Sequence, residues 1–324
     1  MKLSRRIGFA LMMSGLVLAG GEVALRAAGW PKMPSADQFT HNDVYWVQDP
    51  SQRLEAKSHK ETGGSFRVST DANGLRAPLH GEEKPAGTTR VMTLGCSTTF
   101  GWGVDDDASY PARLEAILRE EGHPVEVING GQPGYTSFQG LWLWERTLKN
   151  YHPDIVIFGY IVQDSRTVAY SDKSQAMLQQ NADFLKVNLL YHSRLYMGLR
   201  ALIDARRIST KEKPTDGGSY RVPPDEYAAN IRQFKENIEA AGAKMVFFGF
   251  PLEREGYTGV HRAILHSAAK KLDVPIYDPQ PDFEVRTAQE TLYFPQDRGH
   301  ANAAGNDAIA QGMAQFLVAN RLVP

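Results

Sequence analysis

A group of small polar residues follows the apolar stretch at positions 91–94 of the sequence. From residue 90 to 104 the chain reads RVMTLGCSTTFGWGV, and residues of this size and polarity do not continue a buried strand. A phosphate-binding P-loop needs a lysine that this stretch lacks, and the glycine spacing of a dinucleotide site is also missing. The remaining interpretations are a plain turn between a strand and a helix, a cysteine nucleophile at Cys96 and a serine nucleophile at Ser97.

Asp297 and His300 offer the partners that a serine nucleophile needs. A serine hydroxyl is inert at neutral pH unless a base removes its proton, and that base needs an acceptor on its other ring nitrogen. The two residues stand three positions apart in FPQDRGHANAAG, residues 294–305. A single turn of this loop can bring the carboxylate to Nδ1 of the imidazole while Nε2 faces the end of an earlier strand. The same pattern also fits a capping or surface loop.

The elements that must position these residues alternate along the chain between short apolar runs, typical of buried strands, and segments with the helical spacing of apolar residues. Strands are expected in the apolar runs 91–94, 125–128, 155–161, 245–250 and 275–277. Helices are expected between and after them, at 109–121, 137–150, 225–241 and 261–272. Alternating strands and helices predict parallel pairing and an α/β fold, a three-layer sandwich with helices on both faces of the sheet. Ligands of such sheets bind beyond the carboxyl ends of the strands.

Four segments at those strand ends resemble, in order, the first, second, third and fifth sequence blocks of the SGNH (GDSL-type) hydrolase family. They read VMTLGCSTTFGWGV, VINGGQPGYTS, PDIVIFGYIVQDS and FPQDRGHANAAG, within residues 88–320. The resemblance implies a flavodoxin-like five-stranded parallel sheet in an α/β/α sandwich. It also implies Ser97 as nucleophile, His300 as base and Asp297 as the residue that orients the base. The implied oxyanion hole consists of the backbone N–H groups of Ser97 and Gly134 and a side-chain amide from the third block.

Two positions depart from the pattern of that family. Its Gly-Asp-Ser is Gly95-Cys96-Ser97 here, and its third-block Asn, followed by Asp, is Gln163 followed by Asp164. A thiolate at Cys96 would need its own activating base, so the thiol is expected to pack as a small buried hydrophobe. Gln163 keeps a carboxamide on a stem one methylene longer, and we expect it to supply the third oxyanion donor.

Trp102 and Arg166 are the candidate substrate contacts near these segments. Trp102 is close in sequence to the proposed nucleophile, so its indole could form the floor of a subsite for an acyl group or a sugar. Arg166 could hold an anionic group of the substrate, although a surface salt bridge fits it equally well. The histidines at 123, 152, 261 and 266 are expected at the surface or at helix ends, and with no two at metal spacing near carboxylates we expect no metal and no cofactor.

Composition excludes several classes of protein. The 324 residues include 36 basic and 37 acidic ones, for a formal net charge of −1, so no global field attracts nucleic acid. A single cysteine excludes an intramolecular disulfide and a cysteine-built zinc site. The 42% hydrophobic content is ordinary for a globular protein with a sizeable core.

The chain divides into an N-terminal segment, an extension and one large domain. Residues 1–30 carry basic residues and then an uncharged run ending at Gly21, which predicts a signal peptide or an N-terminal membrane anchor rather than a buried helix of a cytosolic protein. Basic residues before the run place the rest of the chain across the membrane, in the periplasm or outside the cell, with or without anchoring to the inner membrane. Residues 31–87 are an extension with short strands, and 88–324 are the hydrolase-like domain, with 165–222 as an insertion or lid.

The function expected from these features is that of a serine esterase. It would hydrolyse an acyl ester, of which acetyl is the expected case, on a carbohydrate or cell-envelope substrate through an acyl-serine intermediate. One alternative is a polysaccharide O-acyltransferase that uses the same three residues. Another is a non-catalytic glycan-binding protein on the same fold. The expected partners are an acylated carbohydrate or other small ester and, through the N-terminal segment, a membrane.

Overall fold

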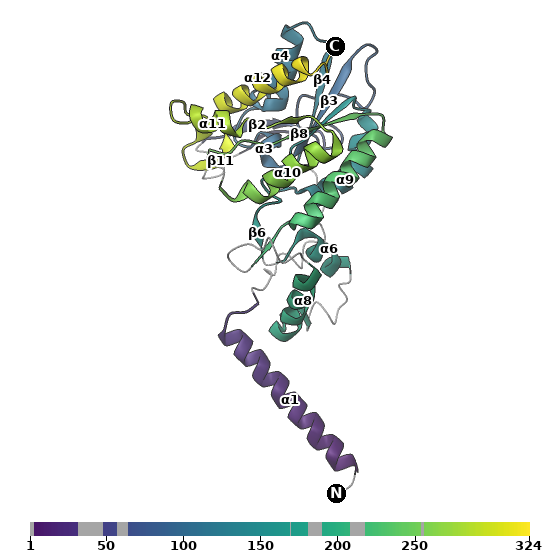
Figure 1. Ribbon diagram of the computed structural model, residues 1–324, viewed down its shortest axis with the longest axis vertical. Helices are drawn as coiled ribbons and strands as arrows, with labels where there is room; N and C mark the ends of the chain where they lie inside the picture. The colour runs from purple at the N-terminus through teal and green to yellow at the C-terminus, as the bar shows by residue number, and fades with distance from the viewer. Residues whose placement is uncertain are drawn as a thin grey trace. The chain divides into compact units, whose positions relative to one another are not determined.

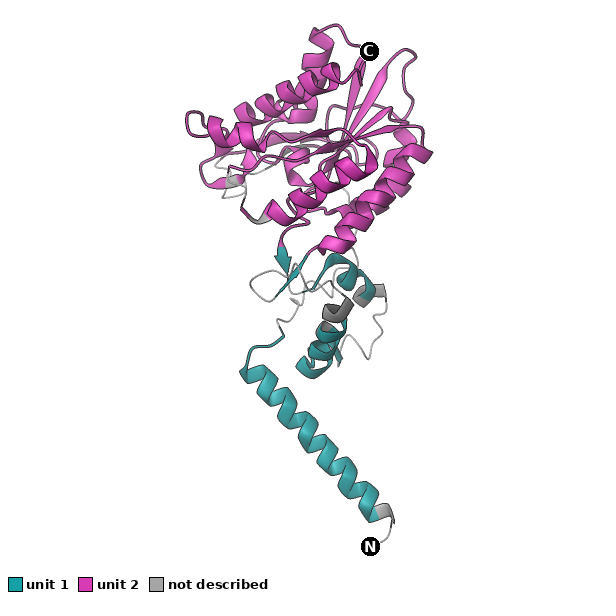
Figure 2. Cartoon of the chain, viewed as in Figure 1, with its two compact units in different colours: residues 1–44, 167–220 teal, residues 45–166, 221–324 magenta. Residues whose placement is uncertain are grey.

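The computed structural model describes residues 3–31, 48–56, 64–168, 170–180, 190–207, 218–253 and 256–324. The chain forms two compact units (Figure 2). One comprises residues 1–44 and 167–220, and the other comprises 45–166 and 221–324. The second unit contains the sheet and every candidate site residue. The boundaries expected at residues 31, 88, 165 and 222 remain predictions.

The second unit is built on a five-stranded parallel sheet with the strand order β4-β3-β5-β8-β9 (Figure 1). Its strands are β3 (Thr89–Gly95), β4 (Val125–Gly131), β5 (Ile155–Phe158), β8 (Lys244–Phe248) and β9 (Ile276–Tyr277). Strand β3, which comes first of these five along the chain, lies second in the sheet, which is the flavodoxin-like order, and the order reverses between β3 and β5. The expected fold class is confirmed. The reversal also places the ligand-binding crevice at the carboxyl ends of these two strands.

Helices cover both faces of this sheet. Figure 1 shows α4 (Tyr110–Glu120) and α12 (Ala303–Ala319) on one side, where they pack against each other, and α9 (Pro224–Ala240) and α10 (Gly259–Leu272) on the other. Helix α5 (Ser137–Arg146) packs against α9. Prolines in the first turn of α4 and of α9 fix where these helices begin, because a proline has no N–H to leave unpaired there.

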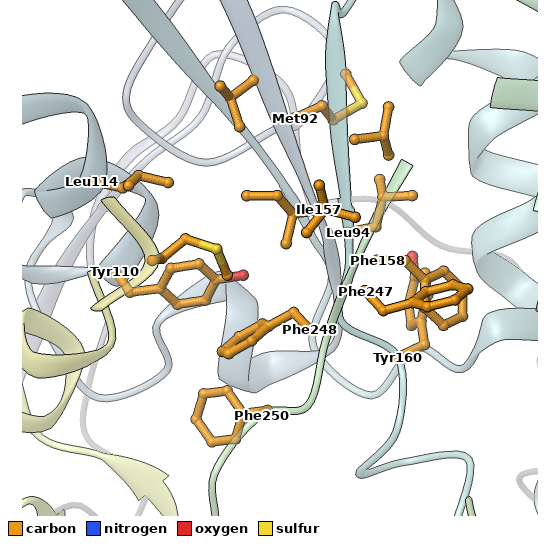
Figure 3. Close-up of a cluster of buried hydrophobic side chains, with 14 of the residues drawn as sticks. Met92, Leu94, Tyr110, Leu114, Ile157, Phe158, Tyr160, Phe247, Phe248 and Phe250 are labelled. Carbon is orange, nitrogen blue, oxygen red and sulfur yellow. The ribbon is translucent and has the colours of Figure 1, made fainter. Parts of the chain in front are cut away.

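The core consists of side chains from both faces of the strands. Successive residues of a strand point to opposite faces, and Figure 3 shows Phe247 with Phe158 on one side of the sheet and Phe248 with Tyr110 on the other. The ring centroids of Phe158 and Phe247 are 5.9 Å apart, and those of Tyr110 and Phe248 are 5.5 Å apart. Burial on both faces explains why the strands are continuous apolar runs rather than alternating ones.

Two elements differ from the expectation. Strand β5 ends at Phe158 rather than at residue 161. The segment expected as a loop before the last helix contains an antiparallel hairpin of β10 (Tyr293–Phe294) and β11 (Asp297–Ala301). This hairpin stabilises the segment with backbone hydrogen bonds, so the residues of β11 are held more firmly than those of an open loop.

The segment before β3 contains a short hairpin, a turn at Asp71 and a buried arginine, Arg76. Strands β1 (Arg53–Ala56) and β2 (Phe66–Ser69) pair antiparallel. In the turn after β2, Oδ1 of Asp71 accepts hydrogen bonds from the backbone N–H groups of Asn73 and Leu75, both at 2.8 Å. Gly74 has φ +76°, a conformation that glycine adopts without strain. The turn thereby directs Arg76 into the interior.

Arg76 is fully buried and binds the chain that follows the candidate nucleophile. Its Nη1 donates to the carbonyl oxygens of Phe100 and Gly101 at 2.8 and 2.6 Å. Its Nε donates to Oδ1 of Asp106 at 3.0 Å, and its guanidinium lies 4.8 Å from the centroid of the Phe100 ring. One side chain therefore joins the N-terminal extension to the turn that carries Ser97.

Replacing Arg76 with methionine is expected to lower the free energy of unfolding by about 3–5 kcal/mol, because Asp106 and several buried carbonyl oxygens lose their donor. Urea unfolding followed by circular dichroism measures this difference. Arg67→Met is the matched control, since Arg67 is exposed and its ion pair with Asp105 should contribute little to stability. Equal losses in the two variants would contradict the role given to Arg76.

The N-terminal helix α1 (Leu3–Ala27) is longer than the apolar run of the sequence suggests. It continues past Gly21, and residues Arg5–Ala27 are long and apolar enough to cross a membrane. Glu22, which interrupts the run, accepts hydrogen bonds at 3.0 Å from the backbone N–H groups of Arg194 and Leu195. A carboxylate is favourable at this position, because these groups begin helix α8 (Arg194–Arg207). An apolar N-terminal helix of this kind can act as a signal sequence or as an anchor.

Candidate active site

Ser97 occupies the first position of the short helix α3 (Ser97–Phe100), directly after β3. Cys96 has an extended backbone, and its carbonyl oxygen accepts hydrogen bonds from the N–H groups of Thr99 and Phe100. A glycine at position 131 of β4 allows α3 to approach, because a Cβ there would lie 2.4 Å from the backbone nitrogen of Phe100. The turn therefore holds Ser97 at the carboxyl end of the sheet.

The structure brings Ser97, His300 and Asp297 into one hydrogen-bonded row. Nε2 of His300 lies 2.8 Å from Oγ of Ser97, although the two residues are far apart in the chain. Nδ1 of His300 is hydrogen bonded to Oδ2 of Asp297 on the other side of the ring. Both His300 and Asp297 lie on strand β11, so the hairpin positions the imidazole. The arrangement is the one expected for a serine nucleophile with its base and orienting acid, and these roles remain predictions.

The carboxylate determines which ring nitrogen carries the proton. Burial raises the pKa of Asp297, but hydrogen bonds from His300 and from the N–H of Gly299 outweigh burial and hold that pKa below its usual value. An ionised carboxylate can only accept, so Nδ1 of His300 must donate to it. In the neutral imidazole, Nε2 is then the acceptor that faces the Ser97 hydroxyl. This is the tautomer that a general base requires.

Cys96 does not share this environment. It is 1% exposed, and burial raises the pKa of its thiol. Its Sγ lies 3.2 Å from Oγ1 of Thr98. A thiol whose pKa is raised holds its proton at neutral pH, so the geometry favours Ser97 over Cys96 as the nucleophile.

The loop after β4 holds Gly134 near the end of β3. The backbone N–H of Gln132 donates to the carbonyl oxygen of Gly95 at 3.0 Å, which ties the loop to β3. A turn follows in which the N–H of Tyr135 donates to the carbonyl of Gln132, and Gly134 there has φ +79°. Few residues other than glycine adopt this conformation without strain. The role of the Gly134 N–H in an oxyanion hole remains a prediction.

The loop after β5 carries Gln163 and Asp164, which have different partners. Asp164 is fully buried and accepts a hydrogen bond from the N–H of Ser137 at 3.0 Å, at the start of α5. Oε1 of Gln163 accepts a hydrogen bond from Nη1 of Arg221 at 3.0 Å. This contact of Arg221 could not be predicted from the sequence, because no periodicity or motif in its polar surroundings relates it to residue 163.

Trp102 is hydrogen bonded to Ser97 and Arg166 to Gln163, and the two side chains differ in exposure. The N–H of Trp102 donates to the carbonyl oxygen of Ser97 at 3.0 Å, and its indole packs edge-on against Phe66 with centroids 5.3 Å apart. Its side chain is half-buried. Arg166 is exposed, and its N–H donates to the carbonyl oxygen of Gln163 at 3.2 Å. Their contacts with substrate remain predictions.

Among the residues that the structure describes, no group of three or more His, Cys, Asp or Glu side chains could hold a metal ion. Burial distinguishes one of the four histidines that were expected at the surface or at helix ends. His261 lies in the first turn of α10, at a helix end, but it is fully buried, and its Nε2 lies 2.8 Å from the carbonyl oxygen of Val222. Burial lowers the pKa of His261 to about 4.

This buried histidine predicts a loss of stability in acid. Unfolded His261 would bind a proton below about pH 6.5, whereas the folded protein resists protonation down to a pKa of about 4. The free energy of unfolding should therefore fall by about 3 kcal/mol between pH 7 and pH 4 through this group. His261→Gln keeps a donor for the Val222 carbonyl but cannot titrate. Urea unfolding at pH 7, 5.5 and 4 should give a shallower decline in the variant, and parallel declines would contradict the assignment.

Comparison with known proteins gives one family match and one short sequence match. Residues 93–308 match the family described as the GDSL-like lipase/acylhydrolase family. An arylesterase of Vibrio mimicus is 34% identical over 68 residues, which are 21% of this chain and 34% of that protein. The chain thus matches about a third of the length of this curated relative.

Solved structures with a similar fold include three hydrolases of low sequence identity. A lipolytic protein of the G-D-S-L family from Desulfitobacterium hafniense, described as putative, gives a TM-score of 0.47 at 15% identity, over 71% of this chain and 99% of that one. The acetylxylan esterase Axe2 of Geobacillus stearothermophilus gives 0.48 at 15% identity, over 71% and 94%. LAE5, from the metagenome of Lake Arreo, gives 0.48 at 17% identity, over 73% and 97%.

Proposed function

The chain belongs to the GDSL-like lipase/acylhydrolase family, and from this premise we propose that it is a serine hydrolase with Ser97, His300 and Asp297 as its catalytic residues. The observation that carries the proposal is the hydrogen-bonded row from the Ser97 hydroxyl through the imidazole to the carboxylate. The row also lies at the carboxyl ends of the strands, where parallel sheets bind ligands.

In the first half of the proposed reaction, Nε2 of His300 takes the hydroxyl proton of Ser97 while Oγ bonds to the carbonyl carbon of the ester. The carbonyl oxygen becomes negatively charged and accepts hydrogen bonds from the backbone N–H groups of Ser97 and Gly134 and from the amide of Gln163. The bond to the alcohol oxygen then breaks, and His300 delivers its proton to that oxygen. The alcohol leaves, and the acyl group remains on Ser97.

In the second half, the same groups act on water. Nε2 of His300 takes a proton from a water molecule while the water oxygen bonds to the acyl carbon. The bond to Oγ of Ser97 breaks, the proton returns from His300 to Oγ, and the carboxylic acid leaves. Throughout, the carboxylate of Asp297 stabilises the imidazolium that forms in each half.

We propose a short acyl ester, acetyl above all, on a carbohydrate or cell-envelope polymer as the substrate. The half-buried indole of Trp102 directly after the nucleophile turn supports this proposal, because an aromatic face can stack on a sugar ring. Helix α1 supports export to the envelope, with or without anchoring. Arg166 remains a candidate for holding an anionic group of such a polymer.

Hydrolysis of p-nitrophenyl acetate, butyrate and octanoate, alongside an acetylated oligosaccharide, tests the substrate. The highest kcat/KM is expected for the acetyl ester, and acetate should be released from the oligosaccharide. Measuring acetyl transferred to an added unacetylated oligosaccharide separates hydrolysis from acyl transfer. A fluorophosphonate probe tests catalysis itself: if wild type takes up no more label than Ser97→Ala, the proposed reaction is wrong and a glycan-binding role replaces it.

A further inference from the structure

Arg221 lies where the chain re-enters the unit that contains the sheet. Its backbone N–H donates to the carbonyl oxygen of Arg166 at 2.8 Å. Its guanidinium donates to three uncharged oxygens. Nη1 donates to the Gly134 carbonyl at 2.7 Å and to Oε1 of Gln163 at 3.0 Å, and Nη2 donates to Oε1 of Gln139 at 3.2 Å.

The bond to Gln163 selects one orientation of its carboxamide. A guanidinium has only donors, so the oxygen of the amide must face Arg221 and the NH₂ must point the other way. Without such a partner the two ends of the amide are nearly equal in shape, and the group can rotate by half a turn. An oxyanion needs the NH₂ end, because the oxygen end would repel the developing charge. The charged donor also polarises the amide and strengthens its N–H groups as donors.

The other two bonds hold the neighbouring loops. A single nitrogen, Nη1, binds both the Gly134 carbonyl and Gln163, so it joins the loop after β4 to the loop after β5. Oε1 of Gln139, which Nη2 binds, also accepts from the N–H of Thr136 at 3.0 Å in the capping box that begins α5. These links reduce the freedom of the two loops that carry the proposed oxyanion donors.

We propose that Arg221 is a positioning residue for the oxyanion hole, which fixes the amide of Gln163 with its NH₂ toward the substrate oxygen. This inference rests on the proposed function. It also accounts for a glutamine where the family has asparagine. The longer side chain has one more rotatable bond. The hydrogen bond from Arg221 compensates for it by fixing the position and orientation of the terminal amide.

Steady-state kinetics on p-nitrophenyl acetate, a neutral ester, test the proposal. Arg221→Met should lower kcat by about 10- to 100-fold with KM changed less than about twofold, because the oxyanion forms only in the transition state. Arg221→Lys, which keeps the charge without the planar fork, should fall between wild type and Arg221→Met. Arg146→Met, an exposed arginine on α5, should leave kcat unchanged.

Two variants of Gln163 distinguish positioning from a structural role. In a Gln163→Ala background, adding Arg221→Met should cause a much smaller loss of kcat than it does in wild type, because the amide that Arg221 orients is already gone and only the link to the Gly134 loop is removed. Gln163→Glu should keep or raise Tm through its ion pair with Arg221, yet lower kcat by about 100-fold since a carboxylate cannot donate. Additive losses in the double variant, or a Gln163→Glu enzyme with wild-type kcat, would overturn the proposal.

Labelling by a fluorophosphonate separates this inference from the function on which it rests. Ser97-dependent labelling of wild type together with unchanged kcat in Arg221→Met would overturn only the role of Arg221. Absence of labelling in folded wild type would overturn the proposed function, and the role of Arg221 with it. If Arg221→Met does not fold, Arg221→Lys and Gln163→Glu carry the same comparison.

Discussion

Replacing Ser97 with alanine is expected to lower kcat for ester hydrolysis by about 10⁴- to 10⁶-fold, leaving only the small contribution of the oxyanion hole and binding. The physical reason is that the variant lacks the oxygen that attacks the ester. Among the residues that the structure describes, no other side-chain oxygen is shown hydrogen bonded to Nε2 of His300, which lies 2.8 Å from Oγ of Ser97. The measurement is single-turnover and steady-state hydrolysis of p-nitrophenyl acetate at neutral pH, with circular dichroism to verify folding.

Cys96→Ala is the matched control for this variant. It alters the neighbouring position and removes the only thiol of the chain, whose buried state and raised pKa argue against a nucleophile. Activity should stay within about threefold of wild type, because a Cys-to-Ala change removes little buried volume. A Ser97→Ala enzyme that keeps its activity, with loss of activity in Cys96→Ala, would reverse the assignment of the nucleophile.

Asp297→Asn is expected to lower kcat by about 10⁴-fold while leaving the fold intact. The carboxylate can only accept a hydrogen bond from Nδ1–H of His300, whereas an amide can present its NH₂ to that nitrogen and stabilise the opposite tautomer. In that tautomer Nε2 carries a hydrogen and cannot accept the Ser97 proton. Asp307→Asn, a surface carboxylate paired with Arg113, is the matched control and should leave kcat unchanged.

The pH dependence of wild type gives a second measure of the same row. The pKa of Asp297 lies below its ordinary value, so the carboxylate stays ionised as pH falls from 8 to 5. Deprotonation of the general base, and not of the carboxylate, should therefore make kcat/KM rise with pH over this range. A flat profile from pH 5 to 8, or an Asp297→Asn enzyme with wild-type kcat, would contradict these roles.

Local sequence patterns predicted most of the fold. The five strands and the order of the intervening helices were predicted because both faces of a central strand are apolar and because proline and glycine mark helix ends. The family resemblance in four segments is confirmed by the family match. The ends of elements were less well predicted: β5 stops at Phe158, and Asp297 belongs to a hairpin, because hydrogen bonds with other segments decide where a strand ends.

Buried polar residues show a clearer division between sequence and structure. His261 lies at a helix end, one of the two positions expected for it, but its burial was not predicted, because the burial follows from contacts with the residues before α9 and with α9 itself. The roles of Arg76 and Arg221 depend on carbonyl and amide oxygens distant in the chain. The hydrophobic periodicity of the sequence gives no information about such long-range contacts.

Residue types and their spacing were enough to predict the chemical groups and the sheet that presents them: a serine after one strand, an Asp-x-x-His segment before the C-terminal helix, and parallel strands whose carboxyl ends share one edge. The hydrogen bond of His300 to Ser97 and that of Arg221 to Gln163 are seen only in the folded chain. Residue types and short-range spacing fix local conformation. Hydrogen bonds between loops depend on which strands are neighbours in the sheet, and packing over the whole domain sets that order.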